Sequence, residues 1–137
     1  MIFSVTCLPD LIRIYQLRYP IYSQGVLCTT FLEDECTVYK VVNKDDELFE
    51  SLSVQFDPRK YYVYSLHEDC PGISHVGIVH YLSGLFSKAD IPILYVNTYA
   101  SNLVFISEEY HEAAIEIFKQ HPNIIFTMIT PSTPSTP

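Results

Sequence analysis

Basic residues are scarce in this sequence of 137 residues. Lys and Arg total 8 against 16 Asp and Glu, so the formal net charge is −8 and the isoelectric point lies near 4.9. A chain with so few cations lacks the basic face that neutralises phosphates or anionic lipid headgroups. The composition therefore argues against nucleic-acid binding and against a polybasic membrane anchor.

Long apolar runs are also missing. None reaches the roughly 18–20 residues that span a bilayer. The N-terminus lacks the basic start of a signal peptide, and Asp10, Arg13 and Arg18 interrupt the first apolar segment. The four cysteines are irregularly spaced, which favours reduced thiols over a disulfide framework: Cys7, Cys28, Cys36 and Cys70. We therefore expect a cytoplasmic protein without membrane contact.

Familiar catalytic motifs are absent, including the GxSxG elbow, the P-loop, GxGxxG and HExxH. The spacing closest to a metal motif is His67-x-x-Cys70 followed by His75, and a structural zinc site needs a second ligand pair. His80 lies five residues after His75 and points to another face of a helix. A Cys–His pair assembled by the fold is the alternative that stays open. We expect no enzyme activity, no metal and no cofactor.

Charge is nearly absent from residues 70–107, which contain only Lys88 and Asp90. Most faces of such a stretch must be buried, by helix packing or by a partner. Aromatic and β-branched residues predict a strand at 61–66 just before it. Residues 91–98 hold four consecutive apolar residues, which predicts a strand buried on both faces.

Two helices are predicted from apolar positions at helical spacing. Ser74 is a candidate N-cap for the first, whose core face is Ile78, Leu82, Leu85, Phe86 and Ala89. Ser107 is a candidate cap for the second, and Pro122 ends it. The core face of that second helix is Tyr110, Ala114, Ile117 and Phe118.

Further strands at 103–106 and 124–129 complete a βαββαβ order. This is the ferredoxin-like split βαβ, an α+β fold in which four strands form one sheet and both helices cover one face. The first sixty residues are less regular and are compatible with a degenerate copy of the same unit. There we predict strands at 11–17 and 36–42, a helix within 22–32 and a short helix at 45–52.

A candidate ligand site lies in the Gly-Ile-Ser-His-Val-Gly segment at 72–77, between a predicted strand and a helix start. Free N–H groups at a helix N-terminus bind anions such as carboxylates, and Gly72 and Gly77 let a ligand approach the backbone. Pro92-Ile93 and Asn97-Thr98-Tyr99 would add carbonyl groups and polar side chains. Such a site suits a zwitterion, and a tightly packed turn without ligand is the alternative.

Four blocks together resemble the ACT domain, the small-molecule-binding regulatory module of amino-acid metabolism. They are Gly77-Ile78-Val79, Ser83-Gly84-Leu85, Ala89-Asp90-Ile91 and Tyr95-Val96-Asn97-Thr98-Tyr99. The pattern is most similar to the Castor family of cytosolic arginine sensors, over about residues 61–120 and more weakly over 10–60. The resemblance implies a degenerate ACT-like region at 1–60, an ACT domain at 61–129 and a disordered Thr/Ser-Pro tail at 130–137.

The resemblance also implies a ligand site between ACT modules. The matching positions are Gly72, Ser74, His75, Val76, Gly77, Val79, Thr98, Tyr99, Ser101 and Asn102, with Pro92 and Ile93 contributed by an apposed module. His75 stands where the arginine sensor has an acid, and Asn102 stands where it has an aspartate. A neutral amide cannot form the charge-assisted pair that selects a guanidinium. The departures weaken the expectation of arginine and leave an amino acid as the ligand class.

The expected function is therefore non-catalytic regulation by an amino acid, of the kind found in sensors upstream of the TOR complex. A homodimer or a second ACT unit would complete the site, through a sheet face that includes Leu94, Val96 and Leu103. Two alternatives stay open. One is a ligand-free ACT-like dimerisation or interaction module, and the other is a regulatory subunit of an amino-acid biosynthetic enzyme.

Overall fold

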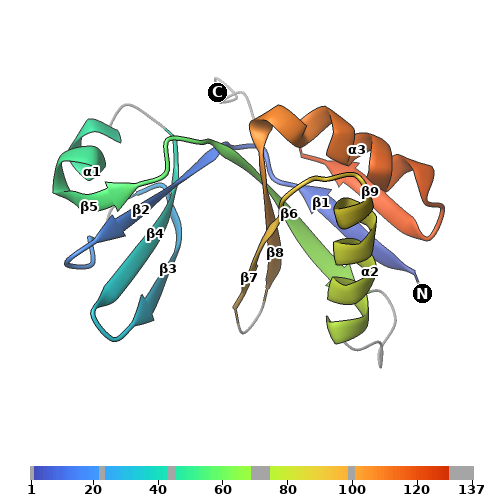
Figure 1. The fold of residues 1–137 in the computed structure, drawn as a ribbon, viewed down its shortest axis with the longest axis horizontal. Helices are drawn as coiled ribbons and strands as arrows, with labels where there is room; N and C mark the ends of the chain where they lie inside the picture. The colour runs from blue at the N-terminus through green and yellow to red at the C-terminus, as the bar shows by residue number, and fades with distance from the viewer. Residues whose placement is uncertain (1, 22–23, 43–45, 69–74, 99–100, 130–137) are drawn as a thin grey trace, which may run out of the picture. The chain divides into compact units, whose positions relative to one another are not determined.

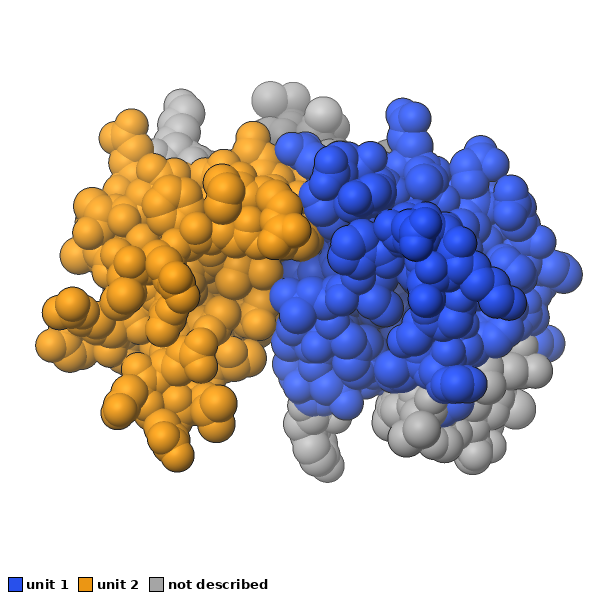
Figure 2. Space-filling model, in the orientation of Figure 1, with its two compact units in different colours: residues 1–9, 62–137 blue, residues 10–61 orange. Residues whose placement is uncertain are grey.

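A computed structural model describes residues 2–21, 24–42, 46–68, 75–98 and 101–129 (Figure 1). Within these ranges the chain forms nine strands, three α-helices and one 3₁₀ turn, which confirms the predicted α+β class. The chain divides into two compact units, residues 1–9 with 62–137 (unit 1) and residues 10–61 (unit 2) (Figure 2). No helix in the described ranges has the length and apolar character needed to cross a membrane.

Unit 1 is a five-stranded sheet in the order β9-β1-β6-β8-β7, with two helices. Its elements are β1 (Phe3–Cys7), β6 (Tyr61–Glu68), α2 (His75–Lys88), β7 (Leu94–Asn97), β8 (Asn102–Ser107), a 3₁₀ turn (Glu108–Tyr110), α3 (His111–Gln120) and β9 (Ile124–Met128). From β6 onward this is the predicted βαββαβ order.

The core of unit 1 lies between one face of the sheet and both helices. Every second residue of the strands points into it, as strand geometry requires. The predicted face of α2 is confirmed for Ile78, Leu82 and Phe86, which are buried there, and Leu85 is partly buried against the same core. Ala89 was wrongly assigned to this face, because it is exposed and follows the end of α2. The predicted face of α3 is confirmed in the same way by Ala114 and Phe118.

Strand β1 is the element of unit 1 that sequence analysis missed. It pairs with β6 in antiparallel register and with β9 in parallel register, so it lies between two strands that a four-stranded ferredoxin-like sheet would place side by side. Phe3, Val5 and Cys7 are fully buried in the core. The expected four-stranded sheet is wrong, because residues 3–7 add a fifth strand. The division into domains at 1–60 and 61–129 stays a prediction.

Strand β7 is shorter and more exposed than predicted. Residues 89–91 form a C-terminal cap on α2 instead: Asp90 adopts a positive φ of 55°, and the Ile91 N–H donates to the Phe86 carbonyl at 2.9 Å. Among the described strands β7 pairs only with β8, so it is an edge strand. Leu94 is 38% exposed, and the expectation of burial on both faces is wrong.

The start of the second helix also differs from the prediction. Ser107 forms no capping hydrogen bond through its side chain, and a 3₁₀ turn follows it before α3 begins at His111. The acidic pair that suggested a helix start, Glu108 and Glu109, lies in that turn.

Unit 2 contains four antiparallel strands in the order β3-β4-β2-β5 and one helix. Its elements are β2 (Ile12–Leu17), β3 (Val26–Leu32), β4 (Glu35–Val41), α1 (Asp46–Leu52) and β5 (Ser53–Phe56). This is the ferredoxin-like order with the first helix replaced by the short link 18–25, as expected of a degenerate half. The strand β5 was not predicted.

The helix predicted within 22–32 is wrong, because residues 26–32 form β3. A two-residue turn joins β3 to β4, with Leu32 paired to Glu35 and Glu33 at a positive φ of 50°. The strand is mostly exposed, so it carries no clear alternation of apolar residues. Its hydrogen bonds to β4 and not its own pattern therefore explain its conformation.

A buried charge cluster joins α1 to the sheet of unit 2. Arg13 and Lys40 are directly opposite each other on β2 and β4, where two cations would repel. Lys40 is completely buried, and its Nζ lies 3.0 Å from Asp46 Oδ1. Arg13 Nη1 lies 3.8 Å from Asp46 Oδ2 and 3.1 Å from Glu50 Oε1. The carboxylates of α1 thus neutralise both cations.

Truncation of the missed strand tests its place in unit 1. We expect Phe3→Ala to lower the free energy of unfolding by about 3–5 kcal/mol, because it removes a fully buried ring that meets Tyr81 of α2 edge-on. Urea denaturation gives the loss, and hydrogen exchange should show it in the amides of α2 and α3. The control Ile2→Ala, at a side chain 55% exposed, should change stability by less than about 0.5 kcal/mol. Equal losses in both variants would contradict this account.

Neutralising Asp46 tests the charge cluster. We expect Asp46→Asn to destabilise the protein by about 3–5 kcal/mol, because Lys40 would stay buried without its carboxylate. The exposed neighbour Glu47→Gln is the matched control on the same helix, with an expected change within about 0.5 kcal/mol. Chemical denaturation of both variants measures the difference, and a loss below about 1 kcal/mol for Asp46→Asn would show that the pair adds little.

Candidate functional site: the end of unit 1 where α2 begins

The first turn of α2 carries the candidate anion site. The helix begins at His75, so the backbone N–H groups of its first residues have no partner within the helix. Gly77 lies in this turn and is half-buried, and Val79 is half-buried in the next turn. The predicted residues Gly72 and Ser74 lie outside the described residues. His75 and Val76 are placed as backbone of α2.

The β7–β8 hairpin supplies the second part of the predicted site. Asn97 pairs with Asn102, and the Thr98 N–H donates to the Ser101 carbonyl at 2.8 Å, with the Thr98 hydroxyl at 3.4 Å from the same oxygen. The Tyr95 hydroxyl donates to Asn102 Oδ1 at 3.1 Å. The hairpin therefore holds the Asn102 amide in a defined orientation. Tyr99, also predicted, lies outside the described part of the chain.

The fold brings these two parts to the same end of unit 1. The N-terminal end of α2, the end of β7 and the start of β8 lie at one end of the sheet (Figure 1). Side chains of a strand point to alternate faces, so Asn102 lies on the same face of β8 as Val104 and Ile106. Those two residues point into the core that the helices cover, so the Asn102 side chain lies on the helix side of the sheet. Gly77 and Asn102 therefore lie at the same end of unit 1 and on the side of the sheet that the helices cover.

Pro92 and Ile93 lie apart from this end, because they precede β7 and the hairpin tip follows it. Pro92 is exposed and Ile93 is half-buried against the core. Within one unit they do not join the other predicted residues. This agrees with their expected role as a contribution from an apposed module, which stays a prediction.

Cysteine chemistry is suppressed in the described core. Cys7, Cys28 and Cys36 are free thiols, and Cys7 is 1% exposed. Burial raises the pKa of Cys7 to about 11 and raises the pKa values of Cys28 and Cys36. A thiol with a raised pKa is protonated at neutral pH and is a poor nucleophile. No group of three or more His, Cys, Asp or Glu side chains in the described residues is arranged to hold a metal.

An aromatic and histidine cluster in unit 1 was not predicted. The Tyr64 hydroxyl lies 2.5 Å from His111 Nδ1, and the Tyr62 ring stacks on the His111 imidazole at 3.7 Å between centroids. Burial raises the pKa of Tyr64, so its hydroxyl stays protonated at neutral pH, and the tautomer of His111 decides which of the two groups donates. Two aromatic residues on alternate positions of β6 hint at such a cluster, but His111 joins it only through the packing of α3 on the sheet.

Part of unit 1 is similar to a known protein family. Residues 65–120 match the family model of the ACT domain. This part of the chain is similar to an ACT domain. The match spans β6 to the end of α3 and includes both parts of the candidate site, and an ACT domain is a regulatory, amino-acid-binding kind of domain. No curated protein matches the chain.

Two solved structures share the fold over most of their length. Atu0741 from Agrobacterium tumefaciens has a TM-score of 0.73 at 15% identity and covers 97% of this chain and 98% of its own. VC0802 from Vibrio cholerae, a protein of unknown function, has a TM-score of 0.69 at 12% identity over 86% of this chain and 88% of its own. At this identity they show a similarity of fold and carry no functional information.

Protonation of His111 should lower the stability of unit 1. Burial lowers the pKa of His111, against a smaller opposing effect of the Glu112 carboxylate. The unfolded chain therefore binds the proton more readily, and the free energy of unfolding should fall as the pH drops below about 6.5. An NMR titration of the imidazole should give a midpoint below about 6.5, and His111→Gln should remove its part of the stability change. A midpoint above that value would contradict the assignment.

Proposed function

We propose that this chain is a non-catalytic regulatory protein that binds an amino acid at the α2 end of its ACT domain. The observation that carries the proposal is the match to the ACT family over the residues that hold both Gly77 and Asn102. Free N–H groups at the start of α2 suit the ligand carboxylate. Carbonyl groups of the hairpin or of an apposed module suit its ammonium group.

We further propose a sensor mechanism of the type that the resemblance to cytosolic arginine sensors implies. A homodimer or a second ACT unit would complete the site, and the ligand would favour one arrangement of modules over another. Only a difference in affinity between two arrangements drives such a change. The protein partner in a TOR-pathway complex and the cytoplasmic location belong to this proposal and rest on the resemblance alone.

The Asn102 amide favours a ligand other than arginine. A guanidinium donates hydrogen bonds and needs acceptors, best supplied by a carboxylate. Asn102 is neutral, and its Oδ1 already accepts the Tyr95 hydroxyl at 3.1 Å. We therefore propose an amino acid with a neutral side chain as the ligand.

A second candidate is an interaction module without a ligand. Leu94, 38% exposed on the edge strand β7, favours this reading. An exposed edge with an apolar side chain is a ready surface for pairing with another chain. The two candidates differ in whether a free amino acid stabilises the protein.

A thermal-shift screen against the twenty amino acids tests the proposal. A ligand that binds only the native state adds about 2.7 kcal/mol at a hundredfold excess over its Kd, which raises Tm by several degrees. Gly77→Val should abolish the shift, because its side chain fills the approach to the N–H groups of α2. Gly84→Val is the matched control, since a Cβ at Gly84 in the same helix meets no atom within 4 Å.

Each outcome of the screen bears on the proposal. A shift with one amino acid, kept in Gly84→Val and lost in Gly77→Val, would support the site and name its ligand. A shift kept in both variants would place the ligand elsewhere. No shift with any amino acid, in a sample shown to be dimeric, would favour the interaction module.

A further inference from the structure

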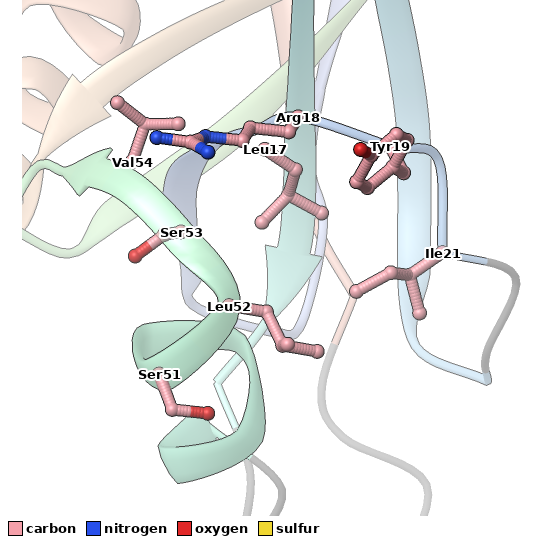
Figure 3. A pocket seen from close by; sticks show the side chains of 8 residues that line it. All are labelled: Leu17, Arg18, Tyr19, Ile21, Ser51, Leu52, Ser53 and Val54. Carbon is pink, nitrogen blue, oxygen red and sulfur yellow. The ribbon is translucent and has the colours of Figure 1, made fainter.

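A cavity of about 540 Å³ lies at the end of strand β2 in unit 2 (Figure 3). One wall comes from residues 17–21, at the end of β2 and just after it. The other wall comes from residues 51–54, where α1 passes into β5. Ligand cavities commonly enclose about 300–1,000 Å³, so this one has room for a small organic molecule. None of the residues predicted to bind a ligand lines it.

The missing helix of unit 2 explains why this space is open. In unit 1 the segment between β6 and β7 contains α2, which covers the sheet. In unit 2 the corresponding link is residues 18–25, and its described residues contain no helix. In the described residues no second helix covers the sheet beyond Leu17, and the opposite wall is formed by the end of α1 and the start of β5.

Apolar side chains on both walls face this space. Leu17 is 1% exposed at its base, whereas Leu52 and Val54 on the opposite wall are 50% and 54% exposed. In the close view the Leu52 side chain points toward Ile21 across the opening (Figure 3). Exposed apolar side chains gathered around a hollow mark a binding site for an apolar group.

Arg18 gives the cavity one cationic group. Its guanidinium lies along the wall between Leu17 and Val54 (Figure 3). Two other arginines form ion pairs: Arg13 Nη1 lies 3.1 Å from Glu50 Oε1, and Arg59 Nη2 lies 2.9 Å from Asp57 Oδ2. Arg18 forms no ion pair with any residue that the structure describes. A guanidinium in this state is available for a carboxylate, which it can bind through two parallel hydrogen bonds.

Tyr19, Ser51 and Ser53 are the other polar side chains of the lining, and the two serines help to define the ligand class. The Ser51 hydroxyl donates to the Leu48 carbonyl, and the Ser53 hydroxyl donates to the Glu50 carbonyl, both at 2.8 Å. Their hydrogens are therefore already in use. Among the described residues no carboxylate side chain lines the cavity, so the ammonium group of an amino acid would find no opposite charge among them.

We propose that this cavity binds a monocarboxylate with a compact apolar tail. The carboxylate pairs with the Arg18 guanidinium, and the tail packs against Leu17 and Leu52. This site lies in unit 2, differs in chemistry from the amino-acid site at α2, and does not depend on it. A branched aliphatic acid is the simplest molecule with both features.

An NMR titration of the full chain with sodium 4-methylpentanoate tests the site. We expect saturable shifts of the amides of residues 17–21 and 51–54. Arg18→Gln should weaken binding at least about tenfold, because a charge-assisted hydrogen bond is lost. Arg59→Gln is the matched control, since Arg59 pairs with Asp57 outside the cavity, and it should bind like the unchanged protein. Leu52→Ala should weaken binding through lost contact with the tail.

The uncharged analogue 4-methylpentanamide and leucine complete the test. Both should bind at least about tenfold more weakly than the acid, the amide for lack of charge and leucine for its unpaired ammonium group. The proposal is overturned if the acid and the amide bind equally, if Arg18→Gln and Arg59→Gln bind equally, or if no amide lining the cavity shifts. Gly77→Val should leave this titration unchanged, so failure here and failure of the amino-acid site are distinguishable.

Discussion

The burial of strand β1 is the constraint on which unit 1 depends. Phe3, Val5 and Cys7 fill the middle of its core, and β9 pairs with no other strand in the described part of the chain. The sheet of unit 1 is therefore complete only when β1, early in the sequence, pairs with β9, which follows the second helix. Residues 10–61 lie in the sequence between two strands that are neighbours in this sheet, β1 and β6. Residues 65–120, which match the ACT family model, therefore leave out the strand that lies between β6 and β9 in this sheet.

Unit 2 has one described helix on its sheet where unit 1 has two, and a charge cluster connects that helix to the sheet. With one helix over four strands, its apolar core is small and centres on Tyr15, Val38 and Phe49. Asp46 and Glu50 lie one turn apart on α1 and so share a face, which meets Arg13 and Lys40 of the sheet. A buried ion pair costs desolvation and adds little net stability, but it tolerates few alternative geometries. The cluster therefore fixes where α1 lies, and α1 in turn forms one wall of the Arg18 cavity.

Local patterns predicted those parts of the fold that depend on local interactions. The face of α2, the face of α3 and the strand β4 each follow from the spacing of their own residues, and Gly77 and Asn102 were found at the ends of such elements. The strands β1 and β3 were missed because their partners lie far away in the sequence or because their side chains stay exposed. The start of β7 was wrong because Asp90 turns left-handed and ties Ile91 to the helix. The Arg18 cavity has no sequence signal, since it results from a helix that is not there.

The two candidate sites differ in what each can recognise. At the end of α2, backbone N–H groups of the first helical turn and carbonyl groups of the hairpin would bind both charged groups of an amino acid, so selectivity would depend on the side-chain contacts. There the Tyr95 hydroxyl engages Asn102 Oδ1, which leaves a guanidinium with a neutral and already occupied acceptor. At the end of β2, a single guanidinium and apolar walls can recognise a carboxylate and a tail but nothing cationic. The two sites would therefore distinguish an amino acid from the corresponding acid that lacks the amino group. The distinguishing feature would be the ammonium group, for which the α2 end offers carbonyl groups and the cavity of unit 2 offers no described carboxylate.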